Sequence, residues 1–198
     1  MVKEGFPFVI TPMIAAMLLA YFAVWWAAGI LVLLAAFMAF FFRDPYRQVP
    51  TEPGIVVAAA DGRVTRIDKN ETGPTISVFL SPLDVHVNRA PIAGRIIAVE
   101  YIPGRKGPAT SNDASFTNER NSITIRNDRI TVTCTQIARI LARRIVCWRK
   151  EGDDVELGEK FGLIKFGSRT ELTLPAGTTV TVEVGDRVFG GETIIARY

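Results

Sequence analysis

The N-terminal part of the chain, up to Phe42, differs sharply from the rest in its pattern of apolar and charged positions. From Gly5 to Phe42 the sequence holds no Asp, Glu, Lys, Arg or His. One straight helix over this whole run would be roughly 57 Å long, whereas the hydrocarbon core of a bilayer is about 30 Å thick. Trp25 and Trp26 lie near the middle of the run, and Trp prefers the membrane interface. The pattern therefore predicts two short helices, near residues 12–26 and 29–42, folded as a membrane hairpin.

A cleaved secretory signal peptide is the main alternative for this segment. Such a peptide has a shorter apolar core followed by a small-residue cleavage site. Here the run is long and ends in three phenylalanines, residues 40–42, so we expect it to be retained as an anchor. Each helix is marginal for a full crossing, and the sequence leaves open whether the hairpin spans the bilayer or is embedded from one side. Lys3, Arg43 and Arg47 flank it on one side, and the positive-inside rule places that side and the following domain in the cytoplasm.

After a linker rich in proline, the pattern changes to that of β-strands. Short runs rich in Val, Ile and Thr, separated by turn residues, are typical of strands. A helical turn is expected only around residues 82–86, and residues 103–121 form the longest loop. We therefore predict a hairpin at residues 1–42 and one mainly β domain at 43–198. The expected strands are residues 55–59, 62–67, 75–80, 94–100, 122–126, 130–135, 140–148, 161–165, 170–174 and 178–184.

One short motif occurs twice in the second half of the chain. Gly152–Glu159 and Gly185–Glu192 share the pattern G-D-x-V-x-x-G-E. Glycine suits the positive φ angles of a tight turn, and we expect the valine to pack beneath it. Similar turns occur in pseudo-symmetric lipoyl- and biotinyl-type β-sandwiches, but neither copy has a lysine attachment motif. The repeat predicts a sandwich- or barrel-like domain without a swinging arm.

Composition and charge narrow the classes of function. The net charge is +3, and basic and acidic residues interleave. A nucleic-acid partner is not expected, because no basic run with interleaved aromatic residues appears. A weakly cationic domain beside an anionic lipid surface fits better. Cys134 and Cys147 form no CxxC pair and the chain has one histidine, so we expect no zinc site built from Cys and His.

The segment Phe166-Gly167-Ser168-Arg169 lies between two apolar strand-like runs. By itself a Gly-Ser turn is usually a hairpin corner. Its surroundings, however, are similar to the cleavage site of short, prokaryotic-type phosphatidylserine decarboxylases. Further motifs resemble this family and occur in its order along residues 43–198. They are G-L-I-K-F-G-S-R at 162–169, L-T-L-P at 172–175, A-A-D-G at 59–62, L-S-P-L-D-V-H-V-N-R-A-P at 80–91 and N-E-R at 118–120.

The resemblance implies a proenzyme that cleaves itself. The hydroxyl of Ser168 would attack the carbonyl of Gly167, and β-elimination from the resulting ester followed by hydrolysis would leave a pyruvoyl group and ammonia. The products would be a β chain of residues 1–167 and an α chain of residues 168–198. The pyruvoyl group would form a Schiff base with the serine headgroup of a phospholipid and act as an electron sink during loss of CO₂. The expected product is phosphatidylethanolamine or its archaeal ether-lipid equivalent, with no metal required.

Further site residues follow from the same motifs. His86 is the candidate for proton transfer, because it is the only histidine and imidazole titrates near neutral pH. Asp61 is expected to orient His86, to balance its charge, or to take part in the cleavage. The longer bacterial branch of the family has a second histidine where this chain has Arg89. Either His86 serves both reactions or Arg89 binds the lipid phosphate, for which Asn118 and Arg120 are further candidates.

Other functions remain open from the sequence. A non-catalytic, membrane-tethered β-sandwich adaptor would use the hairpin and the repeat but would not cleave itself at Ser168. A pyruvoyl enzyme for a soluble amino acid, such as aspartate or histidine, would have no reason to hold its site at a bilayer. An exposed β edge beside the anchor also leaves room for a homodimer.

Overall fold

The computed structural model describes residues 1–104, 118–138, 144–165 and 168–198, and for Arg144 and Ser168 it describes the backbone alone. Contacts divide the chain into two compact units, Met1–Tyr46 and Arg47–Tyr198. The predicted class is confirmed: the chain is mainly β, preceded by two N-terminal helices.

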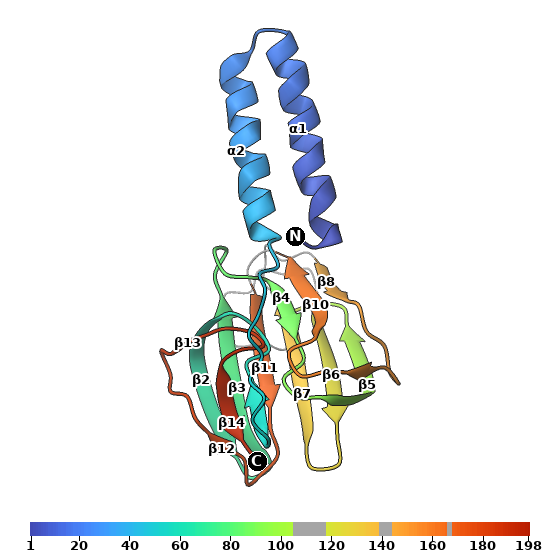
Figure 1. The fold of residues 1–198 in the computed structure, drawn as a ribbon, viewed down its shortest axis with the longest axis vertical. Helices are drawn as coiled ribbons and strands as arrows, with labels where there is room; N and C mark the ends of the chain where they lie inside the picture. The colour runs from blue at the N-terminus through green and yellow to red at the C-terminus, as the bar shows by residue number, and fades with distance from the viewer. Residues whose placement is uncertain (105–117, 139–143, 166–167) are drawn as a thin grey trace. The chain divides into compact units, whose positions relative to one another are not determined.

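The first unit is a helical hairpin (Figure 1). A short 3₁₀ turn, Lys3–Gly5, leads into α1 (Phe6–Tyr21), and α2 spans Trp25–Phe41. The predicted boundaries are wrong by several residues. The helix α1 starts earlier because Pro7 lies in its first turn, where proline is tolerated. It ends earlier because Ala23 adopts a φ of 60°, which breaks the helix before the tryptophans.

Small side chains bring the two helices together. Ala16, Ala28 and Ala35 are buried, whereas most of the large apolar side chains of α1 and α2 are exposed. Close approach through small residues and an apolar outer surface are typical of helices packed in lipid. The segment Lys3–Tyr21 is long and apolar enough to cross a membrane, while α2, with 17 residues, is shorter.

The strands of the described ranges form one eight-stranded sheet and two three-stranded sheets, with every pair antiparallel (Figure 1). The large sheet has the order β13-β2-β3-β11-β7-β6-β5-β9, and the small ones are β1-β14-β12 and β4-β10-β8. The bounds are β1 Ile55–Val57, β2 Gly62–Asn70, β3 Gly73–Leu80, β4 Val87–Arg89, β5 Gly94–Ile102, β6 Arg120–Arg126, β7 Thr131–Ala138, β8 Arg144–Cys147, β9 Asp154–Val155, β10 Lys160–Lys165, β11 Ser168–Thr173, β12 Thr179–Val180, β13 Arg187–Val188 and β14 Ile194–Arg197.

Most predicted strands are present, and the turn after β3 is confirmed at residues 82–84. The run 178–184 is wrong for most of its length, because only Thr179–Val180 pairs with a neighbour. The short strand β4 was not predicted, since its three residues are too few to show a periodic pattern. Residues 139–143, in the predicted strand 140–148, and residues 105–117, in the predicted loop 103–121, lie outside the described residues.

The large sheet has one apolar face. Leu172 on β11 pairs with Ile76 on β3 and Cys134 on β7, and these side chains are almost completely buried. Strand side chains alternate between faces, so the flanking Glu171 and Thr173 lie on the opposite face. The buried face packs with residues of β1, β10 and β14 into one hydrophobic core, which includes Val56, Phe161 and Ile195.

The repeated turns are confirmed as equivalent parts of the fold. Val155 on β9 pairs with Gly94 at the start of β5, and Val188 on β13 pairs with Gly62 at the start of β2. Both valines are buried, and the glycines that open the two turns have positive φ angles. The segment that begins at Asp61 therefore corresponds to the one that begins at Ala93, and the domain is pseudo-symmetric about its two G-D-x-V turns.

Candidate active site

Ser168 is the first residue of β11, which lies inside the eight-stranded sheet. Its backbone pairs with Leu80, the last residue of β3, and with Ala138, the last residue of β7. Position 168 is thus held from both sides at one end of the sheet. Gly167 lies outside the described residues, and the cleavage site itself stays a prediction.

Two other sequence motifs reach the same end of the sheet. Leu80 leads directly into the loop of residues 81–86, which carries His86. On the other side, the amide of Ala138 donates to the carbonyl of Glu119, 2.9 Å away. The side chain of Glu119 accepts from the hydroxyl of Tyr101 at 3.0 Å and from the amide of Ile145 at 3.1 Å. Glu119 was missed by sequence reasoning, although the N-E-R motif contains it.

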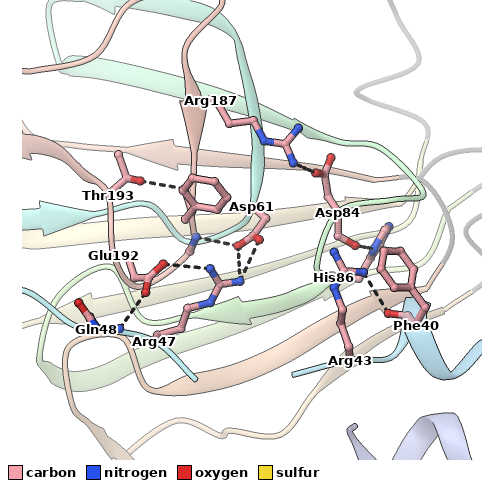
Figure 2. Close-up of polar contacts among 12 residues, drawn as sticks. Phe40, Arg43, Arg47, Gln48, Asp61, Asp84, His86, Arg187, Glu192 and Thr193 are labelled. Atoms are coloured by element: carbon pink, nitrogen blue, oxygen red, sulfur yellow. Dashed lines mark hydrogen bonds and ion pairs between the residues drawn. The ribbon is translucent and has the colours of Figure 1, made fainter. Parts of the chain in front are cut away.

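His86 is completely buried, and its ring is oriented by its own loop. Nδ1 lies 2.9 Å from the carbonyl oxygen of Asp84 (Figure 2). A carbonyl oxygen only accepts, so this hydrogen bond requires the proton on Nδ1 and leaves Nε2 as the basic nitrogen of the neutral ring. The amide of Ile164 donates to the carbonyl of His86 at 3.3 Å. His86 therefore lies beside the end of β10, the strand that precedes Ser168 in the sequence.

The loop that carries His86 is fixed by the carboxylate of Asp84, a residue that sequence reasoning also missed. One oxygen accepts from the amide of Ser81 at 2.7 Å, and the other pairs with Arg187 on β13 (Figure 2). Asp84 is 2 % exposed. A buried carboxylate needs such partners because its desolvation is costly. The sequence signal that could have indicated Asp84 is its place in the S-P-L-D-V-H motif.

Asp61 is held by a different set of partners. Both of its oxygens lie within 2.9 Å of Nη2 of Arg47, and the amide of Gly190 donates to Oδ1 at 2.9 Å (Figure 2). Burial raises the pKa of Asp61, and the Gly190 amide and the Arg47 guanidinium oppose this effect. The group that orients the His86 ring is the Asp84 carbonyl, so a role of Asp61 toward His86 stays a prediction.

Arg47 completes this cluster. Its side chain is 7 % exposed, and Nη1 lies 3.1 Å from Glu192. The amide of Gln48 donates to the other oxygen of Glu192 at 2.8 Å. The Gln48 hydrogen bond, and then Arg47, lower the pKa of Glu192. Two carboxylates thus pair with Arg47, one of the three basic residues expected to flank the anchor.

A chain of buried amides borders the same region. Asn121 donates to Gln136 at 3.0 Å, and Gln136 donates to Asn88 at 2.7 Å. Gln136 pairs across the sheet with Thr170, two positions along β11 from Ser168. Nδ2 of Asn88 is buried and has no hydrogen-bond partner in the part of the chain that the structure describes. Asn88 follows His86 closely in the sequence, so the chain brings a polar donor close to the loop of His86.

Of the expected headgroup-binding residues, Arg89 lies on β4, whereas Asn118 and Arg120 lie together at the start of β6. Arg89 donates to the carbonyl of Gly158 at 3.0 Å, which turns its guanidinium toward one of the repeated turns. Arg120 begins β6 and pairs with Ile137 on β7, and Asn118 lies just before it, partly exposed. Their contacts with a lipid headgroup stay predictions.

The remaining candidates for metal ligands are the two cysteines and the acidic residues. Burial raises the pKa of Cys134 to about 12, so its thiol stays protonated at neutral pH. In the ranges that the structure describes, His, Cys, Asp and Glu form no group of three or more that could hold a metal ion.

Comparison with known proteins identifies the family of the chain. The family model for phosphatidylserine decarboxylase matches residues 34–196. The phosphatidylserine decarboxylase proenzyme of Mycobacterium leprae is 48 % identical over 182 residues, which cover 86 % of this chain and 75 % of the relative. The corresponding proenzyme of Symbiobacterium thermophilum is 42 % identical, covering 98 % of this chain and 94 % of the relative, and that of Nitrosomonas europaea is 41 % identical, covering 99 % and 94 %.

The fold, the site and these relatives define a pyruvoyl-dependent carboxy-lyase that is made as a proenzyme. The chain belongs to the phosphatidylserine decarboxylase family, in its short prokaryotic form.

Proposed function

We propose that this chain cleaves itself between Gly167 and Ser168 and then converts phosphatidylserine to phosphatidylethanolamine at a membrane. The observation that carries the proposal is the position of Ser168 at the start of β11, paired with Leu80, from which the loop of His86 departs. The family match supports the same reaction.

The residues around position 168 fit a pyruvoyl group derived from the serine. Its register partners Leu80 and Ala138 and the nearby Thr170 are almost completely buried, so water is largely excluded. His86 and the buried amide donor of Asn88 supply polar groups at the edge of this apolar region. When formed, the pyruvoyl group supplies the sink for the electrons released as CO₂ leaves.

His86 is the residue that moves protons. With Nδ1 bound to the Asp84 carbonyl, Nε2 carries no proton in the neutral ring and can act as a base. In self-cleavage, Nε2 takes the proton of the Ser168 hydroxyl as it attacks the Gly167 carbonyl. In decarboxylation, the imidazolium returns a proton to the carbon that has lost its carboxyl group. The Asp84 carbonyl stabilises the charged ring and fixes its orientation.

The hairpin and the residues beside it suggest where the enzyme lies in the cell and what it contacts. The basic residues Lys3, Arg43 and Arg47 beside the hairpin support a catalytic domain on the cytoplasmic side of the cell membrane, by the positive-inside rule. Arg89, Arg120 and Asn118 are proposed to contact the lipid headgroup. A homodimer stays a prediction, and the two-residue edge strands β13 and β9 offer few ladder hydrogen bonds to a second copy.

Mass spectrometry and a lipid assay test the proposal together. Active enzyme should give a β chain of residues 1–167 and a pyruvoyl-blocked α chain of residues 168–198. It should decarboxylate phosphatidylserine but not free serine or aspartate. Ser168→Ala should stay uncleaved and inactive. Ser122→Ala, which removes a hydroxyl bonded to Thr135 in the same sheet, is the control and should be cleaved. Active enzyme with an unbroken chain of full length would contradict the proposal.

A further inference from the structure

A row of arginines crosses the eight-stranded sheet next to Ser168. Residues that pair directly across antiparallel strands lie on the same face of the sheet. The registers of β13, β2, β3, β11, β7, β6 and β5 align one continuous row, in which basic and apolar residues are mixed. Its members, in spatial order, are Arg187, Arg63, Phe79, Arg169, Ile137, Arg120 and Ile102. We call Arg187, Arg63, Arg169 and Arg120 the arginine row.

The arginine row carries more positive charge than its neighbours neutralise. Arg187 pairs with Asp84, and Arg169 lies 3.5 Å from Glu171. Arg63 is exposed and donates to a backbone carbonyl at 2.9 Å. Within the ranges that the structure describes, neither Arg63 nor Arg120 has a carboxylate partner. Among the described residues, Arg63 and Arg120 therefore carry positive charge that no carboxylate neutralises.

Exposed apolar side chains lie at the same end of the sheet. Leu83, in the loop that follows β3, is 64 % exposed, and Ile102, in line with the arginine row at the end of β5, is 41 % exposed. Both segments end at the side of the sheet where β11 begins with Ser168. Exposed apolar groups beside unpaired cations are suited to the boundary between lipid headgroups and acyl chains.

We propose that the arginine row, with Leu83 and Ile102, is a docking surface for an anionic phospholipid bilayer. The inference rests on the proposed function and deepens it. The hairpin attaches the enzyme to the membrane, whereas this surface turns the end of the sheet that carries position 168 toward the lipid phosphates. Arginine suits this task because its planar fork binds phosphate oxygens, and each basic residue near an anionic surface strengthens attachment about fivefold.

The chain offers a matched control on the same strand. Arg126 ends β6, the strand that Arg120 begins, and it is exposed. The even spacing places both on one face of the sheet, but Arg126 is at the opposite end from Ser168. Replacing it with glutamine changes the net charge by the same amount without touching the proposed surface.

The first test compares two forms of substrate for the full-length enzyme. Initial rates are measured with phosphatidylserine in phosphatidylglycerol vesicles and with a short-chain phosphatidylserine below its micelle concentration. Arg63→Gln should lower the ratio of vesicle rate to soluble rate about fivefold, and the loss should shrink as salt rises. Arg126→Gln should leave the ratio as it is in the wild type. Equal ratios in all three proteins, or an equal loss in both variants, would overturn the docking surface.

The second test does not depend on activity and separates this inference from the proposed function. An environment-sensitive fluorophore is attached at Ile102→Cys, and a control fluorophore at Asp128→Cys in the turn at the other end of the sheet. Both use a Cys147→Ser background, because Cys147 is partly exposed. In phosphatidylglycerol vesicles, spin-labelled lipid should quench the label at 102 and not the one at 128. Quenching of the label at 102 in a protein without decarboxylase activity would reject the proposed function and leave the docking surface standing. A label at 102 that stays in water would reject only the docking surface.

Discussion

Arg187 and Asp84 form an ion pair between the two chains expected after self-cleavage. Arg187 lies on β13, in the future α chain, and Asp84 lies in the β chain, just before His86. The Asp84 side chain is 3 % exposed, while its own carbonyl oxygen binds the ring of His86. One residue thus connects the small chain to the orientation of the proposed proton carrier.

Removing Arg187 should therefore affect catalysis through His86. Arg187→Gln leaves a buried carboxylate without its cation, which should lower stability by about 1–3 kcal/mol. We expect kcat with soluble phosphatidylserine to fall about tenfold while KM changes little, because the loop and not the headgroup contact is disturbed. Arg187→Lys, which keeps the charge, should recover part of kcat. An unchanged kcat in Arg187→Gln would remove Arg187 as a positioning residue.

Replacing His86 tests the proton carrier directly. His86→Ala should slow decarboxylation by a factor of about 10²–10⁴, the usual contribution of a general acid–base group. Because the same nitrogen is proposed to activate Ser168, self-cleavage should also slow, as seen by the rate at which the α chain appears on a denaturing gel. Normal cleavage with lost decarboxylation would leave His86 in the second reaction only.

The two chains should stay together after cleavage. In β11, Ser168–Thr173 pairs along its whole length with both β3 and β7, and β14 lies between β1 and β12. The α chain is thus interleaved with the β chain and cannot leave without unfolding. Processed enzyme should elute as one species in size-exclusion chromatography under native conditions and separate only in denaturant. Release of a free α chain from native enzyme would contradict this arrangement.

The cluster of Arg47, Asp61 and Glu192 predicts a dependence of stability on pH. The pKa of Glu192 is lowered from its ordinary value of 4.5. Its contribution to stability is present above that value and is lost as the pH falls through the lowered pKa. Burial raises the pKa of Asp61 above its ordinary 3.8. The contribution of Asp61 to stability therefore depends on pH in the opposite direction. It is present at low pH and is lost as the pH rises through the raised pKa.

The variant Glu192→Gln removes the pH-dependent contribution of Glu192 and leaves that of Asp61. At pH 7 the variant should be about 0.5–1 kcal/mol less stable than the wild type, because Glu192 is partly exposed. The difference should begin to shrink as the pH falls below 4.5 and should disappear below the lowered pKa of Glu192, in thermal unfolding followed by circular dichroism. Glu151→Gln, at an exposed position in a turn, should match the wild type throughout. A difference that grows toward low pH would contradict the assignment.

The sequence predicted the strands well, because alternating Val, Ile and Thr reflect the burial of one sheet face, as at Leu172. The helix boundaries were wrong, because the turn depends on the backbone of Ala23 and not on the preference of Trp25 for an interface. Motifs indicated Ser168 and His86. They could not indicate the pair of Arg47 and Glu192, which lie far apart in the sequence and meet only in the folded domain.

The two halves of the pseudo-symmetric domain differ in whether they carry a carboxylate beside the repeated turn. The segments that begin at Asp61 and Ala93 occupy equivalent positions beside the repeated turns, yet only the first carries a carboxylate. At the second, the backbone carbonyl of Ala93 accepts from Asn127 at 3.0 Å. The first position therefore holds a buried carboxylate, whereas the equivalent position in the second half is held by a hydrogen bond to its backbone. A repeated scaffold can in this way carry different chemical groups at structurally equivalent positions.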